Sequence, residues 1–377
     1  MIEKHLNIIS FNVPYPADYG GAIDVFYKLK ALKESGIKII LHTFTYGREE
    51  AEELEKYCEK VHYYQRKTGV ISQISYLPYI VYSRRNKELL TNLQSNGYPI
   101  LFEGLHSCYY LNHPLLEKRL KLVRAHNIEH EYYSGLAQNS SSILKKLYFH
   151  WEAFKLKKYE KQLHFANRIL SLSSREKAYF EKAYGKEKTA YLPLFFASGE
   201  KIVLSETTKP YVLYHGDLST PENINAAKFL IQFVASLDEE INWIFAGRNP
   251  DDSLLELSQP HKNISIYANL EEKALTQLIR AAAVNLLYTN QISGVKLKLL
   301  NALYNGHHCL VNEKMVAGSG LDELCQILPD KAEEIIAVIK SCFTEEFPKE
   351  SIAKREAVFS TLYNNQKNAI ILIDLLP

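Results

Sequence analysis

Histidine and acidic residues follow two predicted buried strands in the first half of the chain. Glu103 and His106 come after the apolar run 99–102, and His126 comes after the run 120–125. Ligands of parallel sheets bind beyond the carboxyl ends of strands, where a histidine can hydrogen-bond a sugar hydroxyl or transfer a proton. We therefore take His126 and Glu103 as candidate catalytic residues, with a purely structural hydrogen-bonding role as the alternative. No HExxH or similar spacing is present, so we expect no metal site.

A double glycine follows the first predicted strand. Gly20 and Gly21 allow backbone N–H groups to approach a ligand at a helix N-terminus, which favours an anion or sugar hydroxyls. Asp18 and Asp24 flank the pair and are candidates for binding acceptor hydroxyls. An ordinary tight turn with solvated or capping acids is the alternative interpretation.

Two strand ends in the second half offer phosphate-binding groups. Gly216 lies at the end of the predicted strand 211–217, where it allows a pyrophosphate to approach the next helix. Arg248 follows the strand 241–247, where it either faces a phosphate or points to water. The sequence has neither GxGxxG nor GxxxxGK[ST], so it predicts neither a dinucleotide-binding turn nor a P-loop.

The run from position 293 to position 301 is the most informative one. We expect a helix over 294–305, with unpaired N–H groups at its start and two lysines in its first turns, which together form a diphosphate cradle. A solvated amphipathic helix is the alternative. The candidate donor-binding residues of this run are Ser293, Gly294, Val295, Lys296, Lys298 and Asn301.

Strand-like and helix-like runs alternate in both halves of the chain, which predicts an α/β protein with two doubly wound parallel sheets. The polar stretch at 196–210 lacks helical periodicity and is the expected linker. We predict a first domain over 1–195, a second over 211–350, and a helical segment over 351–377 that packs back on the first domain.

Composition narrows the class of protein. The chain has 377 residues, of which 46% are hydrophobic and 23% charged, so it is not disordered. Its five cysteines form no CxxC pair, and its first residues do not resemble a signal peptide, which together predict a cytoplasmic protein. The net charge of +2 combines a basic first half with an acidic second half, so the two halves are expected to have different partners.

The stretch 143–163 contains six lysines interleaved with aromatic residues. Such a stretch is more often a packed helix with a charged outer face. A basic amphipathic helix can also lie on an anionic membrane, so peripheral contact with the inner membrane surface is the alternative. No motif that reads DNA or RNA accompanies the charge, and we expect no nucleic-acid partner.

Taken together, these segments resemble the GT-B glycosyltransferases, and among them the retaining family 4 type. The resemblance covers most of the chain and is carried by YPADYGGAIDVFYKLKALKESGIKIILHTF, RAHNIEHEYYSGLA, WEAFKLKKYE, SLSSREKAYF, HGDLSTPENINAAKFL and SGVKLKLLNALYNGHHCLVNEKMVAGSGL. It implies two Rossmann-like domains facing each other across a cleft. It also implies a nucleotide-sugar donor on the second domain, an acceptor on the first, and no required metal or other cofactor.

By the same resemblance, His126 supports the transferring sugar, Gly20 and Gly21 approach the donor phosphate or the acceptor, and the run after position 293 contacts the diphosphate. Two departures stand out. The family usually has two acids, seven residues apart, where this chain has Ser293 and Asn301. An amide binds a ribose hydroxyl without charge assistance, a loss of roughly 1–2 kcal/mol. The loop after HGD also lacks the usual arginine and Lys-Gly pair.

Three functions are compatible with these observations. The first is transfer of a hexose-type sugar from a nucleotide-diphosphate-sugar to a glycan or lipid-linked acceptor, with retention and without a metal. The second is a catalytically weak or inactive homologue that binds a sugar or a partner. The third is a nucleotide-sugar epimerase on the same fold.

Overall fold

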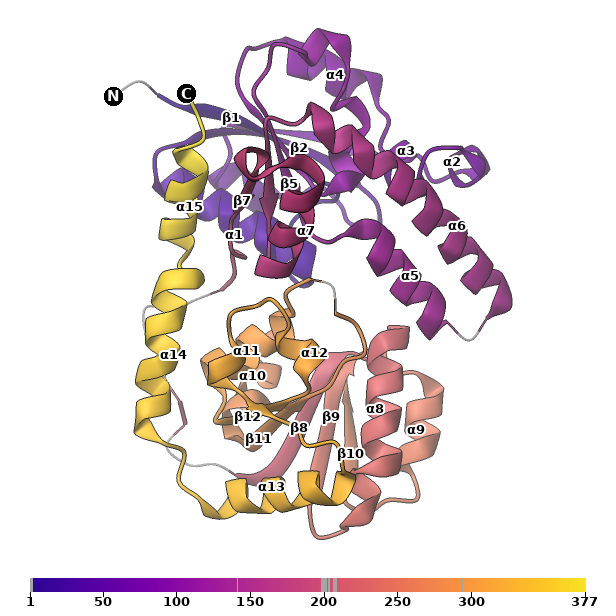
Figure 1. Cartoon of the computed structure of the whole chain (residues 1–377), viewed down its shortest axis with the longest axis vertical. Helices are drawn as coiled ribbons and strands as arrows, with labels where there is room; N and C mark the ends of the chain where they lie inside the picture. Colours follow the sequence, from indigo (N-terminus) through magenta and orange to yellow (C-terminus); the bar gives the residue numbers. More distant parts are fainter. Residues whose placement is uncertain (1–2, 141, 198–201, 203, 206–208, 293) are drawn as a thin grey trace. The chain divides into compact units, whose positions relative to one another are not determined.

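The computed structural model describes residues 3–140, 142–197, 202, 204–205, 209–292 and 294–377 (Figure 1). Contacts divide the chain into two compact units. The first unit consists of Met1–Ala137, Ser142–Ser198 and Thr361–Pro377, and the second of Gln138–Ser141 and Gly199–Ser360. The second unit thus reaches Ser360, whereas the sequence placed its end at position 350. Positions 198–201, 203 and 206–208 of the expected linker lie outside the described residues.

The first unit contains a parallel sheet of seven strands in the order β3-β2-β1-β4-β5-β6-β7. The strands are β1 (His5–Ile9), β2 (Lys38–Thr45), β3 (Lys60–Gln65), β4 (Ile100–Glu103), β5 (Lys121–Ala125), β6 (Arg168–Ser171) and β7 (Thr189–Tyr191). The helices that accompany this sheet are α1 (Gly20–Glu34), α2 (Val70–Ile74), α3 (Tyr79–Tyr82), α4 (Lys87–Gln94), α5 (Glu129–Asn139), α6 (Ile143–Tyr159), α7 (Ser174–Tyr184) and α15 (Asn365–Ile373).

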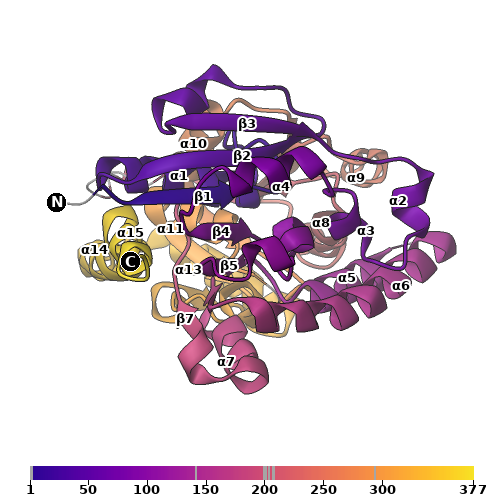
Figure 2. The same cartoon turned by 90° about the horizontal axis from the view of Figure 1, so that it is seen from above.

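Both faces of this sheet are buried, and consecutive side chains of a strand point to opposite faces. Leu101 and Leu122 pack with α1 and α15 on one face. Phe102 and Val123 pack with α4 and α6 on the other face. The C-terminal helix α15 therefore belongs to the core of the first unit, beside α1 (Figure 2).

The second unit contains a parallel sheet of six strands in the order β10-β9-β8-β11-β12-β13. The strands are β8 (Lys209–Asp217), β9 (Asn242–Arg248), β10 (Ile264–Ala268), β11 (Ala282–Leu287), β12 (His308–Val311) and β13 (Gln326–Ile327). The helices from α8 to α14 are α8 (Pro221–Phe233), α9 (Asp252–Ser258), α10 (Glu272–Ala281), α11 (Leu297–Asn305), α12 (Glu313–Val316), α13 (Ala332–Thr344) and α14 (Lys349–Leu362).

Helix α11 begins later than the sequence predicts. Its first residue is Leu297, and Lys296 is its N-cap. The prediction that the helix already starts at position 294 is therefore wrong, and the N–H groups before Lys296 do not belong to it. Gly294 explains the difference, because its φ of +72° lies in the left-handed region and cannot continue a right-handed helix. Among all helices of the described residues, none is both long and apolar enough to span a membrane.

The packing of α15 predicts a large effect of truncating one of its side chains. Leu372 is fully buried in the core shared with α1, whereas Ile370, on the same helix, is 54% exposed. We expect Leu372→Ala to lower the unfolding free energy of the first unit by about 2–5 kcal/mol, and Ile370→Ala to change it by less than about 0.5 kcal/mol. Chemical denaturation of both variants measures this. Equal effects would show that α15 is not part of the core.

Candidate functional site

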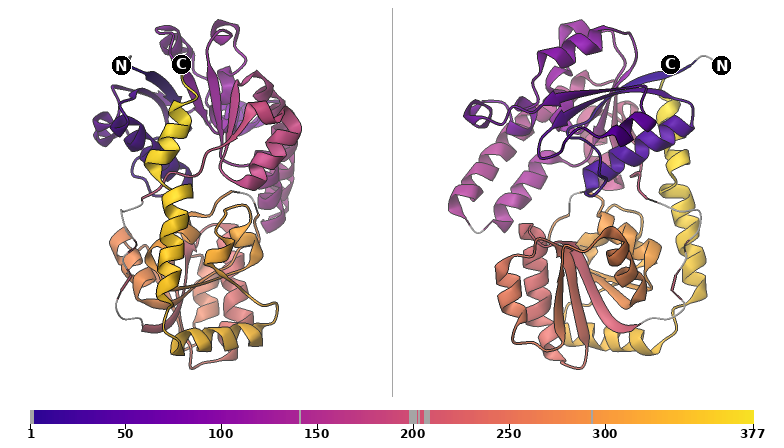
Figure 3. Two further views of the ribbon diagram at one scale, coloured as in Figure 1. Left: turned by 60° about the vertical axis from the view of Figure 1, so that its left-hand side comes forward. Right: turned by 180° about the vertical axis from the view of Figure 1, so that it is seen from behind.

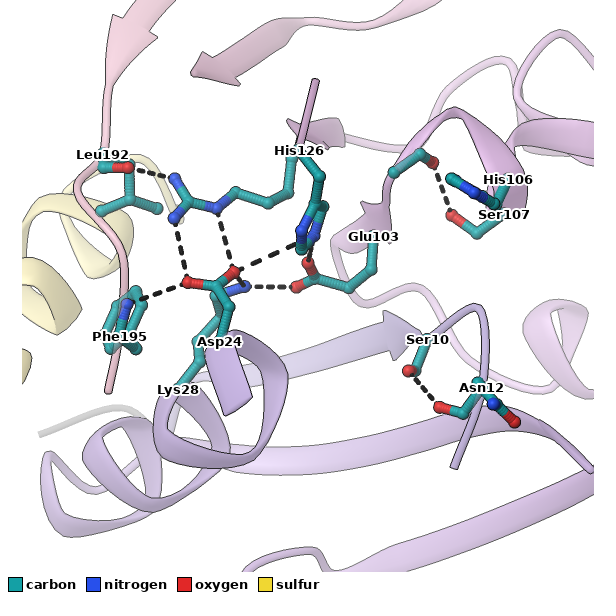
Figure 4. Close-up of polar contacts among 12 residues, drawn as sticks. Ser10, Asn12, Asp24, Lys28, Glu103, His106, Ser107, His126, Leu192 and Phe195 are labelled. Atoms are coloured by element: carbon teal, nitrogen blue, oxygen red, sulfur yellow. Dashed lines mark hydrogen bonds and ion pairs between the residues drawn. The ribbon is translucent and has the colours of Figure 1, made fainter. Parts of the chain in front are cut away.

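Five ionisable side chains meet at the carboxyl end of the first sheet (Figure 4). They are Asp24 and Lys28 from α1, Glu103 from β4, Arg124 from β5 and His126 just beyond β5. The Lys28 Nζ atom lies 3.0 Å from Asp24 Oδ2 and 2.7 Å from Glu103 Oε1. The Arg124 Nη2 atom lies 3.1 Å from Asp24 Oδ1. We call these five residues the buried charge cluster.

Regular secondary structure brings the cluster together. Asp24 and Lys28 are four residues apart on α1, so both face the sheet. Glu103 and Arg124 are register partners on the adjacent strands β4 and β5. The side chains of these four residues are completely buried, and only His126, whose side chain is 10% exposed, reaches the surface of the cluster.

The charges of the cluster compensate one another. Burial by itself raises the pKa of Asp24, but the cations Arg124 and Lys28, together with His126, hold it well below the usual value. Burial likewise raises the pKa of Glu103, and Lys28 and the hydrogen bond from His126 bring it below its usual value. The two carboxylates, Asp24 and Glu103, are therefore matched by two permanent cations, Lys28 and Arg124.

His126 presents one ring nitrogen to a ligand. Its Nε2 atom lies 2.9 Å from Glu103 Oε2, so the hydrogen bond assigns the proton of the neutral ring to Nε2. Among the described residues, Nδ1 has no hydrogen-bond partner and can accept one from a hydroxyl. The carboxylate of Glu103 is buried and engaged by Lys28 and His126, so Glu103 holds the imidazole in place. A catalytic role of Glu103 itself stays a prediction.

Asp24, Glu103 and His126 are also a possible metal-ligand set, because their ligand atoms lie within 4.8 Å of one another. However, the ammonium of Lys28 and the guanidinium of Arg124 already contact the two carboxylates. A divalent cation would enter next to two fixed positive charges and would have to displace their hydrogen bonds. The donor set therefore does not fit a divalent metal.

The Gly20–Gly21 turn shapes the edge of this site. Helix α1 begins at Gly20 and has neither a side-chain cap nor an acid in its first turn. A Cβ atom on Gly21 would lie 2.4 Å from the ring of Phe11, which packs edge-on against His126. The absence of a side chain at Gly21 thus leaves space for the Phe11 ring, which packs against the His126 imidazole. Asp24 does not reach an acceptor as we expected, because it is completely buried.

The other flanking acid, Asp18, forms an ion pair with Arg48. The Arg48 guanidinium also lies over the ring of Tyr19, 4.7 Å from its centroid. The expected contact of Asp18 with an acceptor hydroxyl therefore competes with this arginine.

Two arginines near this turn were not identified from the sequence. Arg84 is 5% exposed, and its Nε atom donates to the Phe11 carbonyl at 2.7 Å. Burial lowers its pKa to about 9, and the charge of Arg66 contributes to the shift. Neither guanidinium forms an ion pair with a carboxylate of the described residues. The basic composition of the first half was the only signal for them.

The second unit contains a lysine whose hydrogen-bond partners are neutral. Lys298 Nζ lies 2.9 Å from Asn223 Oδ1 and 3.3 Å from the Tyr214 hydroxyl. Burial lowers the pKa of Lys298 to about 8, although the negative charge of Glu222 opposes this shift. Within the described chain, no carboxylate forms an ion pair with Lys298. A bound anion would stabilise this ammonium.

Of the other predicted residues of the second unit, Gly216 lies close to the partners of this lysine, and Arg248 lies at the end of a neighbouring strand. Gly216 lies at the end of β8, where a Cβ atom would be 3.1 Å from the Asn223 amide, so it belongs to the same cluster. Arg248 is exposed at the end of β9, next to Asp217 in the strand register.

The run before α11 is only partly placed. Lys296 Nζ donates to the Gly294 carbonyl at 2.9 Å, and Val295 between them is half-buried. Asn301 is half-buried within α11. Ser293 lies outside the described residues. The structure therefore brings Lys298 and Gly216 together with Tyr214 and Asn223, two residues that the sequence did not single out as ligands.

We compared the chain with known proteins, first by sequence and then by structure. No protein-family model matches the chain. The "Uncharacterized 44.6 kDa protein in cps region" of Klebsiella pneumoniae is 27% identical over 324 residues, which cover 83% of this chain and 77% of that protein.

Solved structures resemble nearly the whole chain. Sucrose-phosphate synthase from Thermosynechococcus elongatus superposes with a TM-score of 0.70 at 16% identity, covering 99% of this chain and 98% of that one. HepE from Anabaena, in complex with UDP and glucose, gives 0.64 at 13% identity and 99% coverage of both chains. TarM gives 0.66 at 10% identity, covering 99% and 98%. The chain therefore has the GT-B fold that the resemblance implied; the family 4 detail stays a prediction.

The buried charge cluster predicts a pH-dependent loss of stability when Lys28 is removed. Lys28→Met leaves two buried carboxylates with Arg124 as their only permanent cation, and we expect a destabilisation of about 3–5 kcal/mol at pH 7. Without Lys28 the pKa of Glu103 rises above its unfolded value, so the variant recovers part of this loss as the pH falls. Lys33→Met, at an exposed position of the same helix, is the control.

Denaturation of both variants between pH 7 and pH 5, roughly the window where such a carboxyl takes up its proton, measures the effect. A Lys28→Met variant that is as stable as the control would show that the cluster is not electrostatically coupled.

Proposed function

We propose that the chain is a glycosyltransferase that moves a hexose-type sugar from a nucleotide-diphosphate-sugar to a glycan or lipid-linked acceptor. The observation that carries the proposal is the position of His126, just beyond strand β5 of a GT-B fold. Its Nε2 atom is hydrogen-bonded to Glu103, which leaves Nδ1 for a ligand. In this position the ring can accept a hydrogen bond from a hydroxyl of the transferring sugar. HepE, which has the same fold, was solved with UDP and glucose, and this supports a nucleotide-sugar donor.

The donor diphosphate would bind the second unit. Lys298 is the main candidate, because burial lowers the pKa of its ammonium and no carboxylate of the described chain forms an ion pair with it. A diphosphate leaving group gains negative charge as its bond to the sugar breaks, and a preorganised cation stabilises that charge. In the proposed reaction the acceptor oxygen replaces the diphosphate on the same face of the anomeric carbon, and the acceptor proton leaves with the diphosphate.

The reaction would need no metal. Lys296 and Lys298, near the start of α11, supply positive charge on the donor side. The carboxylates of the buried charge cluster already form ion pairs with Lys28 and Arg124. We therefore expect transfer to continue in the presence of a chelator.

The acceptor would carry a phosphate or a similar anion. Arg84 and Arg66 place two guanidinium groups close to the Gly20–Gly21 turn, and neither is neutralised by a carboxylate of the described residues. This favours a lipid-linked, phosphate-bearing acceptor over a neutral glycan. A cytoplasmic location is supported by the five cysteines, all of which are free.

A binding protein without turnover is the second candidate. Asn301 stands where a carboxylate is usual, and its amide gives a ribose hydroxyl only a neutral hydrogen bond. A donor would then bind weakly or only as a ligand. An assay for turnover decides between the two candidates, because only an enzyme cleaves the bond between the sugar and the nucleoside diphosphate.

Activity is tested first with a thermal-shift screen of UDP, GDP, ADP and CMP sugars, since a ligand of the native state raises its melting temperature. The stabilising donor is then assayed for sugar transfer with and without EDTA. We expect transfer in both conditions, and a fall in kcat of about 100-fold or more in His126→Ala. His164→Ala, at an exposed position of the same unit, should retain full activity.

Absence of transfer together with a clear thermal shift would favour the binding protein. Conversion of the donor sugar without any acceptor would instead indicate an epimerase. Either result contradicts the proposed transfer.

Lys298 gives donor binding a specific pH dependence. Because its pKa is about 8, raising the pH through 8 removes the positive charge and weakens binding of the nucleoside diphosphate. We expect Lys298→Met to raise Kd about 10- to 100-fold at pH 7 and to abolish the pH dependence. Lys273→Met removes an exposed lysine of α10 and should change neither the Kd nor its pH dependence. Titration calorimetry from pH 7 to about 9 measures both effects, and an unchanged Kd in Lys298→Met would refute this role.

A further inference from the structure

Two helices of the first unit expose an unusual amount of apolar surface. The side chains come from α2, from Tyr76 shortly after it, and from one face of α6. These residues are between 49% and 83% exposed. We define the α2–α6 surface by these residues: Val70, Ile71, Ile74, Tyr76, Ile143, Leu144, Leu147, Trp151 and Phe154.

The exposed side chains of α6 form a stripe and are not scattered. Leu144, Leu147, Trp151 and Phe154 recur at intervals of three and four residues, so they lie along one side of the helix. Leu156, on the opposite side, is completely buried in the core of the unit. The helix thus uses one apolar face for packing and leaves a second one exposed.

A buried ion pair fixes the connection after α2 against α6. Glu152 and Lys155 pair with each other on the buried side of α6. Glu152 Oε2 accepts from the Tyr79 amide at 2.8 Å, and Lys155 Nζ donates to the Ser75 carbonyl at 3.1 Å. Figures 1 and 3 show α2 and the N-terminal half of α6 projecting on the same side of the first unit. The surface is therefore part of the folded unit.

The charge around this surface has one sign. The stretches 66–76 and 143–161 contain two acidic residues, Glu152 and Glu160, and both are buried. The exposed charged residues of the two stretches are Lys67, Lys145, Lys146, Lys157, Lys158 and Lys161. An apolar face whose own two stretches expose lysines and no acid is complementary to a layer of anionic headgroups above an acyl interior.

We propose that the α2–α6 surface binds the face of an anionic lipid bilayer. The exposed leucine, isoleucine and tryptophan side chains enter the boundary between headgroups and acyl chains, and the lysines contact lipid phosphates. A protein partner fits less well, because lysine is depleted in protein interfaces relative to the rest of the protein surface. Helix α6 lies along the membrane plane, since it is an amphipathic helix packed on its own unit.

Trp151 gives this proposal a direct readout. The chain has two tryptophans, and the other one, Trp243, is 1% exposed in the core of the second unit. We expect vesicles that contain phosphatidylglycerol to shift the tryptophan emission to the blue, and brominated lipids to quench it. Vesicles of phosphatidylcholine alone should produce much smaller changes, and added salt should weaken binding to the anionic vesicles.

The variant Leu144→Ser/Leu147→Ser tests the surface without removing the reporter. We expect its partition onto anionic vesicles to fall about tenfold or more, because two exposed apolar side chains no longer enter the bilayer. Phe233→Ser/Leu237→Ser removes two exposed apolar side chains of the second unit and should bind like the parent chain. Circular dichroism and thermal melting establish that both variants are folded.

Equal binding of the Leu144→Ser/Leu147→Ser variant and the parent chain would overturn the proposal. So would the absence of vesicle binding, or self-association of the full chain in which Trp151 becomes buried without lipid, since the surface would then be an interface between copies. These measurements use no sugar donor, so a failure of the proposed transfer activity leaves their interpretation unchanged.

Discussion

The ion pair between Asp24 and Arg124 connects more of the first unit than any other contact described above. Asp24 also accepts a hydrogen bond from the Phe195 amide at 2.9 Å, and Arg124 Nη2 donates to the Pro193 carbonyl at 2.9 Å. The pair thus joins α1, β5 and the chain segment that leaves the sheet after β7. Asp24 Oδ2 also lies 3.9 Å from His126 Nε2, so the ion pair that fixes the end of the sheet lies next to the imidazole.

Buried charges in this protein fall into two groups with different consequences. Lys28 and Arg124 are paired with carboxylates, which makes their positions fixed and their neighbourhood neutral. Arg84 and Lys298 contact only neutral oxygens among the described residues, and burial lowers the pKa of each. A buried cation that lacks a counter-ion is unfavourable in the free protein. An anionic ligand would remove this penalty, so the second group, and not the first, marks where phosphate groups are expected.

The sequence predicted the fold well where strands are buried on both faces. The run 99–102 is continuously apolar and is followed by the polar Glu103, and the run 120–125 is apolar apart from Lys121 and Arg124, as buried parallel strands are in the main. The edge strands β3, β7 and β13 were missed. Strand β3 is partly exposed and polar, and β7 and β13 have only three and two residues. His126 was predictable from its place after a strand. The pairing of Glu103 with Lys28 was not, because it depends on which face of α1 meets which strand.

The stretch 143–163 shows why charge counted along a sequence differs from charge presented at a surface. By sequence it contains six lysines, Glu152 and Glu160. In the folded unit both acids and Lys155 are buried, and Lys155 hydrogen-bonds the chain after α2. Folding thus removes every acidic side chain from this face and leaves the remaining lysines beside exposed apolar residues. The surface is more uniformly basic and more apolar than the sequence suggests, because the acids are used to build the unit beneath it.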